Sequence, residues 1–500
     1  MRTTFSRRVA AVAAGGVGWL VAANAGAYCR TVSKAPPADW NVATRGCYTG
    51  EEVGAKQLYW GNACIGYSLQ KDGSRQATLE QATAAAASAF AVWNDAACSG
   101  GKASIQAMDM GPVECGEARY NQKLANQNVI VFRDDTWPYS DPNNTLGLTT
   151  VTFDTATGEL LGSDMEINGT QKLRVANAVA LDDAPSDDGA DGFDLATILM
   201  HEAGHFLGLA HSASNDAVMY ARYQEGVPLS TDDQEGLCTV YTPSATRITS
   251  SGVVAAGACD PKPPNGFSSQ CAAPAIPSTE DKGEGSGCAV RGMSGSGEGA
   301  KGMWVFMSGL FGAFAWRRSK RRGAWATWAA MGASAAILIS AIEARASVAI
   351  AVLFDELVGR SSAAVVVTPV GRESAWEDGR IVTYTRLQVD RLIAGSAPSA
   401  IEVRSFGGSV GKIGQIVEGE ASFDSDRAAL AFLEPARGVA VRHGSYAVTA
   451  RAQGVFALSS AAPGVAVRLV VPENLRASSP PRAWSQGGAM LLAPRADASR

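Results

Sequence analysis

The sequence has 500 residues, a formal net charge of −5 at pH 7 and 18% charged residues. A chain of this length suggests roughly two to four domains with enough material for buried cores. The mild acidity provides no strongly basic surface, so the composition argues against a nucleic-acid-binding protein. Nothing in these numbers indicates an oligomeric state.

The first 27 residues have the pattern of a secretory signal peptide. Three early arginines precede an apolar stretch over residues 9–23, and Ala25-Gly26-Ala27 offers an A-x-A cleavage site before Tyr28. We therefore expect an exported protein that is either secreted or held at the cell surface.

The cysteines support export. All nine lie between Cys29 and Cys288, and an exported segment rich in cysteine is typical of a disulfide framework. The alternative, a zinc–cysteine site, is disfavoured because the chain has no C-x-x-C pair. Because nine is odd, at least one cysteine is unpaired or modified. Cys259 and Cys271 are expected to close a small loop.

Residues 28–194 alternate between strand-like and helix-like patterns, which predicts a mixed α/β domain. An irregular, cross-linked entry segment is expected over residues 28–66. Periodicity of apolar residues predicts a long helix over 78–94. Short β-rich runs bounded by turn residues predict strands at 65–69, 129–132, 146–153 and 164–168.

An acidic loop follows, from Leu181 to Asp194. Clustered carboxylates suit Ca²⁺, although a solvated loop explains the composition equally well. Asp194 is expected to cap the helix that begins at Leu195.

The strongest motif is His201-Glu202-x-x-His205-x-x-Gly208-x-x-His211, which holds three of the four histidines in the chain. Positions i and i+4 share one face of a helix, so His201 and His205 can bind one metal ion. Gly208 allows the chain to turn sharply and return His211 as a third ligand. Three nitrogens leave one position of a tetrahedral Zn²⁺ for water, and Glu202 is placed to take the proton of that water.

Downstream residues make the motif more specific. Ser212 directly follows the third histidine, and Met219-Tyr220 begins eight residues after that histidine. Ser230 is a plausible N-cap of a last helix, with Asp232 and Asp233 favourable in its first turn.

The extended histidine motif with this methionine is similar to the metzincin metallopeptidases, and the downstream L-S-x-D-D-x-x-G-L-x-x-x-Y resembles their matrixin branch. The resemblance covers about residues 58–242 within a domain expected at 28–246. It implies an α/β (α+β) fold with a mixed sheet and an active-site helix.

The resemblance also implies one catalytic Zn²⁺ held by the three histidines, Glu202 as the general base, and Met219 in a turn beneath the metal. It further implies docking of an extended peptide on the strand near 146–152. Gly208, Asp232 and Asp233 would support the site. Two familiar features have no counterpart. Residues 45–48 do not match the cysteine latch of the propeptide, and the one remaining histidine, His443, cannot supply a second, structural zinc site.

Residues 247–301 are rich in Gly, Pro and Ser and read as a linker. Residues 302–322 combine a short apolar stretch with five positive charges and resemble a MYXO-CTERM sorting tail. Residues 323–346 contain a second apolar run with a signal-like end. We expect a membrane association through 303–342. A plain anchor, a hairpin, a cleaved tail and a fusion of two exported proteins remain alternatives.

Residues 347–475 are enriched in β-branched residues and predict an all-β sandwich or barrel of unknown function, and 476–500 are expected to be a disordered tail. Taken together, the sequence predicts an exported zinc metalloendopeptidase that acts on a peptide or protein. The alternative is a zinc-stabilised, non-catalytic surface module. A third hypothesis is that the C-terminal β domain restrains the protease.

Overall fold

The computed structural model describes residues 27–37, 40, 42–175, 192–271, 350, 352–423, 427–438, 441–459, 467–470, 484–485 and 489–492. The described residues on both sides of the long central gap belong to one compact unit. Among them, no helix is both long and apolar enough to cross a bilayer. The apolar runs expected at 303–342, the sorting-tail resemblance, Cys288 and most of the acidic loop lie outside the described residues.

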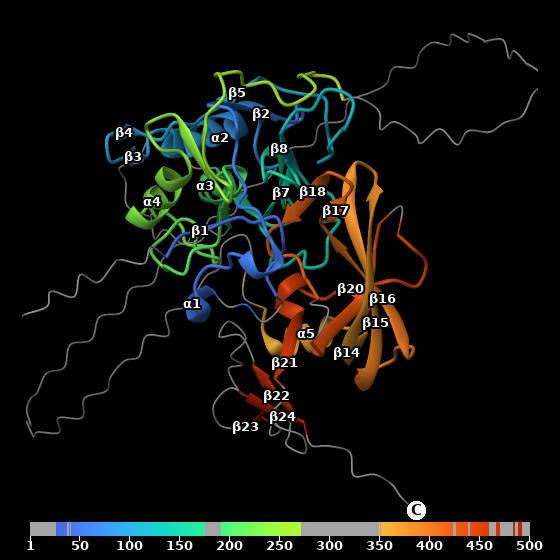
Figure 1. Cartoon of the computed structure of the whole chain (residues 1–500). Helices are drawn as coiled ribbons and strands as arrows, with labels where there is room; N and C mark the ends of the chain where they lie inside the picture. The colour runs from blue at the N-terminus through green and yellow to red at the C-terminus, as the bar shows by residue number, and fades with distance from the viewer. Residues whose placement is uncertain are drawn as a thin grey trace, which may run out of the picture. The chain divides into compact units, whose positions relative to one another are not determined.

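A seven-stranded mixed sheet forms the frame of the N-terminal part (Figure 1). Its strand order is β17-β18-β7-β8-β6-β2-β5. The bounds are β2 Cys64–Leu69, β5 Gln106–Asp109, β6 Val129–Phe132, β7 Gly147–Asp154, β8 Leu160–Ile167, β17 Gly408–Val410 and β18 Ile413–Val417. Strands β5, β2, β6 and β8 pair in parallel, whereas β7 runs antiparallel to both β8 and β18.

Two helices pack against this sheet. Helix α2 spans Leu79–Asn94 and begins with a capping box in which Thr78 accepts from the backbone N–H of Gln81. Helix α3 spans Leu195–Phe206, and Asp194 caps it by accepting from the N–H of Thr197, as the sequence predicts. The indole of Trp93 is fully buried, and its N–H donates to the carbonyl of Met200, 2.8 Å away.

The remaining elements of the N-terminal part are short. They are β1 Cys29–Arg30, α1 Val42–Arg45, β3 Ala97–Cys98, β4 Gly101–Lys102, β9 Leu173–Arg174, β10 Phe193–Asp194, β11 Leu209–Ala210, α4 Thr231–Val240, β12 Thr246–Thr249 and β13 Gly252–Ala255. Helix α4 begins with the predicted Ser230 cap, which forms a capping box with Asp233.

Apart from helix α5 and a 3-10 turn at Arg451–Gly454, the regular elements in the described residues of the C-terminal part are strands, as expected. Strands β14, β15, β16, β20 and β19 form a ring, because β14 pairs with both β15 and β19. Aliphatic side chains such as Val365, Leu387 and Val403 fill a core of this part. The bounds are α5 Phe354–Arg360, β14 Ala363–Glu377, β15 Arg380–Gly395, β16 Ala400–Phe406, β19 Ala429–Pro435, β20 Tyr446–Val448, β21 Val455–Ser459, β22 Val467–Val470, β23 Trp484–Ser485 and β24 Ala489–Leu492.

Among the described residues, four disulfides cross-link the N-terminal part, which confirms the predicted framework. They join Cys29 to Cys47, Cys64 to Cys259, Cys98 to Cys238, and Cys115 to Cys271. The expected Cys259–Cys271 loop is therefore wrong. Each of these two cysteines is bonded to a strand or loop far away in sequence.

Residues 247–271 also differ from the expected linker. They continue the folded domain through β12 and β13, and the side chain of Arg247 is fully buried. Its guanidinium donates to the carbonyls of Trp60 and Asn62 at 2.7 and 2.8 Å. The buried Arg247 and the disulfides of Cys259 and Cys271 hold this Gly- and Pro-rich segment against the domain, because the segment cannot form a core by itself. Similarly, β23 and β24 fall inside the expected tail.

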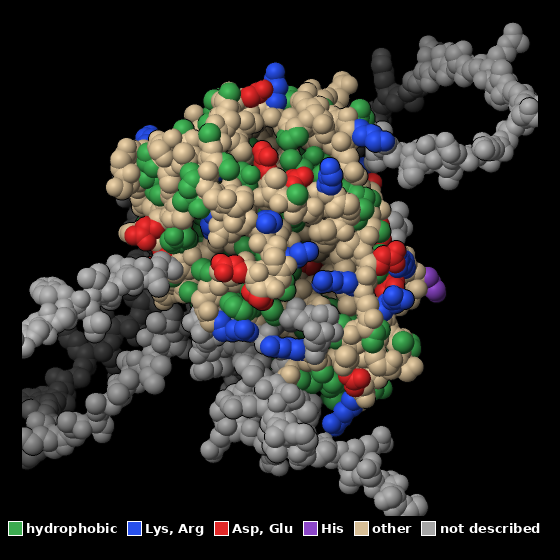
Figure 2. Space-filling view, in the orientation of Figure 1, with side chains coloured by type: hydrophobic (Ala, Val, Ile, Leu, Met, Phe, Trp, Pro, Cys, Tyr) green, Lys and Arg blue, Asp and Glu red, His purple; other side chains and the backbone are tan. Residues whose placement is uncertain are grey.

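Charged side chains of both signs are mixed on the visible face of the molecule. On the face drawn in Figure 2, basic and acidic groups alternate with polar and apolar ones. This agrees with the small net charge of the chain.

Candidate metal centre

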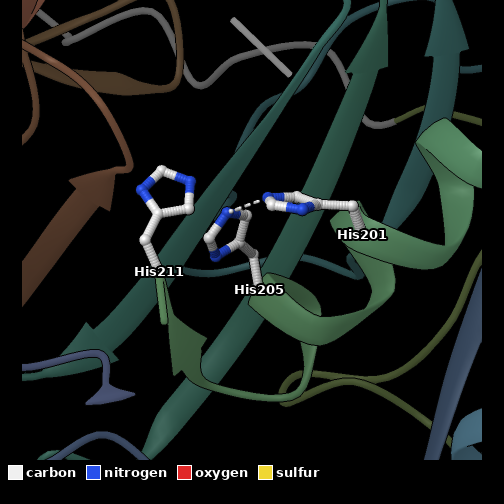
Figure 3. A group of neighbouring side chains, drawn as sticks. All are labelled: His201, His205 and His211. Carbon is white, nitrogen blue, oxygen red and sulfur yellow. Dashed lines mark hydrogen bonds between the residues drawn. The ribbon is translucent and has the colours of Figure 1, made fainter. Parts of the chain in front are cut away.

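The three motif histidines converge on one point (Figure 3). His201 and His205 project from consecutive turns of α3, and His211 follows strand β11. One ligand atom from each imidazole lies within 4.8 Å of the others. The helical spacing of four residues and the turn after α3 thus bring together the three predicted ligands.

The turn depends on Gly208. Helix α3 ends at Phe206, and Gly208 has φ of 91°, in the left-handed region that glycine adopts readily. Its N–H donates to the carbonyl of His205, 2.9 Å away. The chain then reverses into β11 and carries His211 back beside the helix.

Backbone carbonyls orient two of the imidazoles. Nδ1 of His201 lies 2.7 Å from the carbonyl oxygen of Val218, and Nδ1 of His205 lies 2.8 Å from that of Leu209. A carbonyl oxygen can only accept a hydrogen bond, so both rings carry their proton on Nδ1. The unprotonated Nε2 of each ring then faces the centre. The Nε2 atoms of the two rings are 3.0 Å apart.

Burial keeps the histidines neutral. It lowers the pKa of His205 to about 4, and it lowers the pKa values of His201 and His211 well below the ordinary value for histidine. The neighbouring imidazoles lower the pKa values of His201 and His211 further. Neutral imidazole is the form that binds metal ions.

Glu202 lies next to the triad and is fully buried. Its Oε2 accepts a hydrogen bond from the hydroxyl of Thr149, whereas its Oε1 has no partner among the described residues. Nε2 of His211 is likewise buried without a partner. Buried polar atoms without partners are costly, and a metal ion with a bound water would satisfy both atoms. The residues present therefore fit zinc.

Two residues of this arrangement were missed in the sequence. Thr149 and Gly147 lie on β7, and a β-carbon on Gly147 would be 2.6 Å from Oε1 of Glu202. Their role depends on the packing of β7 against α3, which no local motif reveals. The signals for this region were the expected strand at 146–153 and the peptide-docking role that the resemblance implies near 146–152.

Met219 lies under the site helix. It is 2% exposed, and a β-carbon on Gly204 would meet its sulfur at 2.0 Å. Asp233 fixes the turn that holds this methionine. Its carboxylate accepts from the backbone N–H groups of Val218 and Met219 at 2.8 and 3.0 Å. The structure thus brings the predicted Met219 and Asp233 together.

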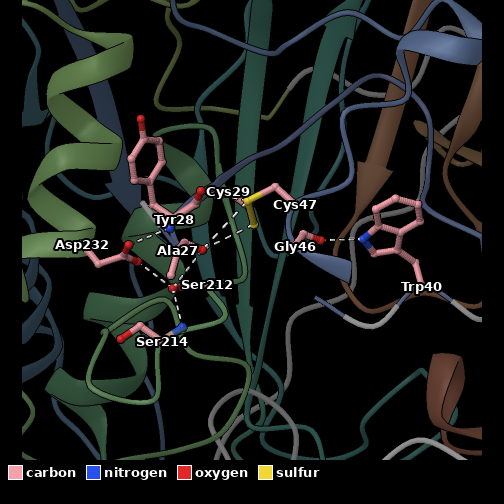
Figure 4. Close-up of a disulfide and its surroundings, with 9 residues drawn as sticks. All are labelled: Ala27, Tyr28, Cys29, Trp40, Gly46, Cys47, Ser212, Ser214 and Asp232. Atoms are coloured by element: carbon pink, nitrogen blue, oxygen red, sulfur yellow. Dashed lines mark hydrogen bonds between the residues drawn. A yellow bond between two sulfur atoms is a disulfide. The ribbon is translucent and has the colours of Figure 1, made fainter. Parts of the chain in front are cut away.

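Asp232 has a different partner set (Figure 4). Its carboxylate accepts from the hydroxyl of Ser212 at 2.6 Å and from the backbone N–H of Tyr28 at 2.7 Å. The adjacent Cys29–Cys47 disulfide fastens the same N-terminal segment. Asp232 of α4 therefore connects this helix both to Ser212, which follows the third histidine, and to Tyr28 near the start of the described chain.

Three converging histidines beside a buried carboxylate form a group that could hold a metal ion. Residues 59–242 match the family model described as Matrixin (Peptidase_M10), so this part of the chain is a matrixin domain. The first residue of the match agrees closely with the sequence-based boundary.

Curated relatives are similar over the same region. The chain is 34% identical to human matrix metalloproteinase-20 over 113 residues, which are 22% of this chain and 20% of the relative. It is 32% identical to human matrilysin over 111 residues, 21% of this chain and 35% of the relative. For metalloendoproteinase 1-MMP of Arabidopsis thaliana, 34% identity extends over 95 residues, 18% of this chain and 26% of the relative. The similarity thus spans about a fifth to a third of each of these relatives.

Proposed function

We propose that this protein is an exported zinc-dependent endopeptidase. The observation that carries the proposal is the pair of unpartnered buried atoms, Oε1 of Glu202 and Nε2 of His211, at the point where three neutral imidazoles converge. His201, His205 and His211 would hold the ion. Zinc bound there would acidify a water molecule and polarise the scissile carbonyl.

Glu202 would handle the proton. Burial raises the pKa of its carboxyl to about 8, and a nearby cation favours the ionised form, which can accept a proton. The hydroxyl of Thr149 donates to the other oxygen and fixes the carboxylate. Glu202 can therefore take a proton from water and return it to the leaving amine.

Strand β7 would guide the substrate. It carries Gly147 and Thr149 beside Glu202, so an extended peptide paired with its backbone would pass the metal site. The four disulfides favour an oxidising compartment and support export. The alternative of a non-catalytic module would leave a buried Glu202 without a use.

The test is cleavage of an unfolded protein by the zinc-loaded full chain. Mass spectrometry of the products should show new termini inside the substrate. A chelator should stop their appearance, and added zinc should restore it. Products only from the substrate ends would contradict an endopeptidase, and cleavage that persists after zinc is removed would contradict the metal site.

A further inference from the structure

The outer edge of the matrixin sheet is covered by the C-terminal part of the same chain. Among the strands of the matrixin domain, β7 is the last at this side of the sheet, and β18 pairs with it antiparallel from Ile413–Asp154 to Val417–Thr150. The backbone N–H and C=O groups on this edge are those that an added peptide strand would use. In the structure, β18 already uses them.

Side chains make this pairing specific. The buried amide of Gln415 donates to the hydroxyl of Thr152 at 3.0 Å and accepts from the backbone N–H of Ile381 at 2.6 Å. Gly414 lies over the buried ring of Phe153, where a β-carbon would be 2.3 Å from the ring. The strand therefore fits closely, with no space for a side chain at residue 414.

Glu418 follows β18 and reaches the metal site. Its Oε1 lies 3.5 Å from Nδ1 of His211, and both side chains are about one-fifth exposed, at 22% and 21%. In Figure 3 one ring nitrogen of His211 faces the other two histidines and the other faces away. Arg451 holds the backbone here by donating to the carbonyl of Glu418 at 2.7 Å. The side-chain carboxylate of Glu418 thus contacts His211, the third predicted zinc ligand, on the side away from the other two histidines.

Two buried ion pairs fasten the same C-terminal part to the matrixin domain. Arg380 lies 2.8 Å from Glu166, whose side chain is 1% exposed. Arg360 lies 2.7 Å from Asp141, which is equally buried. Breaking such a pair leaves a buried charge without its partner, which is costly in free energy. The contact is therefore a built interface and not a chance approach of two surfaces.

We propose that residues 413–418 are an inhibitory segment, in which β18 occupies the peptide-binding edge of β7 and Glu418 fills the space beside His211. The unmodified chain would then hydrolyse peptides slowly, and hydrolysis would become faster when this segment moves away. The proposal rests on the peptidase function proposed above.

The experiment uses the full chain with a larger side chain introduced at residue 414. In Gly414→Ala the new methyl group meets the ring of Phe153 and should push β18 from β7. Gln415→Ala removes the side-chain bonds instead and is the second variant. Gly359→Ala is the control, because a β-carbon there has no neighbour within 4 Å. Hydrogen exchange of the amides at 147–154 is measured in metal-free protein, and peptide hydrolysis is measured in zinc-loaded protein.

Both variants should raise exchange in 147–154 and hydrolysis by on the order of tenfold or more, while Gly359→Ala behaves like the unmodified chain. Faster exchange without faster hydrolysis would overturn the inhibitory role. Unchanged exchange in both variants would overturn it as well, because β18 would then not depend on these contacts. If the unmodified chain already cleaves as fast as the variants, the inhibitory segment is refuted and the peptidase stands. If no zinc-loaded chain cleaves, the peptidase function itself fails.

Discussion

Gly147 and Glu202 are in such close contact that a β-carbon at residue 147 would lie 2.6 Å from Oε1 of the glutamate. The strand and the site helix are thus fitted to each other at the atom that is expected to take a proton. Any side chain at residue 147 has to displace this carboxylate.

The first prediction concerns this contact. Gly147→Ala should lower kcat by about 10- to 100-fold, because a general base displaced by even a small distance loses most of its effect. The zinc content should stay unchanged, since no histidine is touched. Gly116→Ala, where a β-carbon has no neighbour within 4 Å, should keep full activity. A Gly147→Ala enzyme with normal kcat would contradict the role of Glu202.

A second prediction compares two helical glycines. Alanine normally stabilises a helix by up to about 1 kcal/mol relative to glycine, so Gly359→Ala in α5 should be stabilising. At Gly204 of α3 the new methyl group would collide with the sulfur of Met219, and overpacking costs typically about 1–3 kcal/mol. Gly204→Ala should therefore lower the free energy of unfolding. Chemical denaturation of both variants provides the comparison, and stabilisation by Gly204→Ala would show that Met219 is not packed there.

The third prediction concerns Asp233 and zinc affinity. Its carboxylate accepts from the N–H of Val218, whose carbonyl in turn orients His201. Asp233→Asn should therefore weaken zinc binding by about 10- to 100-fold, the range seen when groups that orient metal ligands are lost. Competition with a chelator of known affinity measures the change. The exposed Asp216→Asn variant should bind zinc normally, and equal affinities in the two variants would refute this link.

The fourth prediction concerns pH and a carboxyl outside the metal site. Burial raises the pKa of Asp164 to about 7 in the folded chain. Between about pH 4 and 7 the folded state holds a proton that the unfolded state has released, so stability falls as pH rises, by up to about 1.4 kcal/mol per pH unit. Asp164→Asn removes this slope. Denaturation of metal-free protein at pH 5 and pH 8 should favour the variant more at pH 8, whereas a pH-independent difference would show that Asp164 is ionised throughout.

The metal ligands were predictable because they are local. Helical spacing joins His201 to His205, and a single glycine turn returns His211, so eleven consecutive residues define most of the site. Thr149, Gly147 and Glu418 were not found, because they reach the site through strand pairing over long distances in sequence. The same limit explains the disulfides. Cysteine count and export predicted a framework, but the Cys64–Cys259 pair depends on how the chain returns over its own sheet.

The C-terminal part shows a related division. Enrichment in β-branched residues over 347–475 predicted strands, and the structure has strands there such as β15, Arg380–Gly395. The ring closure through β14 and β19 and the pairing of β18 with another part of the chain depend on tertiary contacts. No periodicity within these short segments could indicate their partners.

The most direct measurement for the central claim is bound zinc and peptide hydrolysis in the same preparation of Glu202→Ala, compared with the unmodified chain. Because Glu202 is not among the three converging ligands, the variant should retain one zinc per chain. Its hydrolysis should fall by at least about 100-fold, because the proton acceptor is gone. Undiminished hydrolysis with zinc bound would contradict the account.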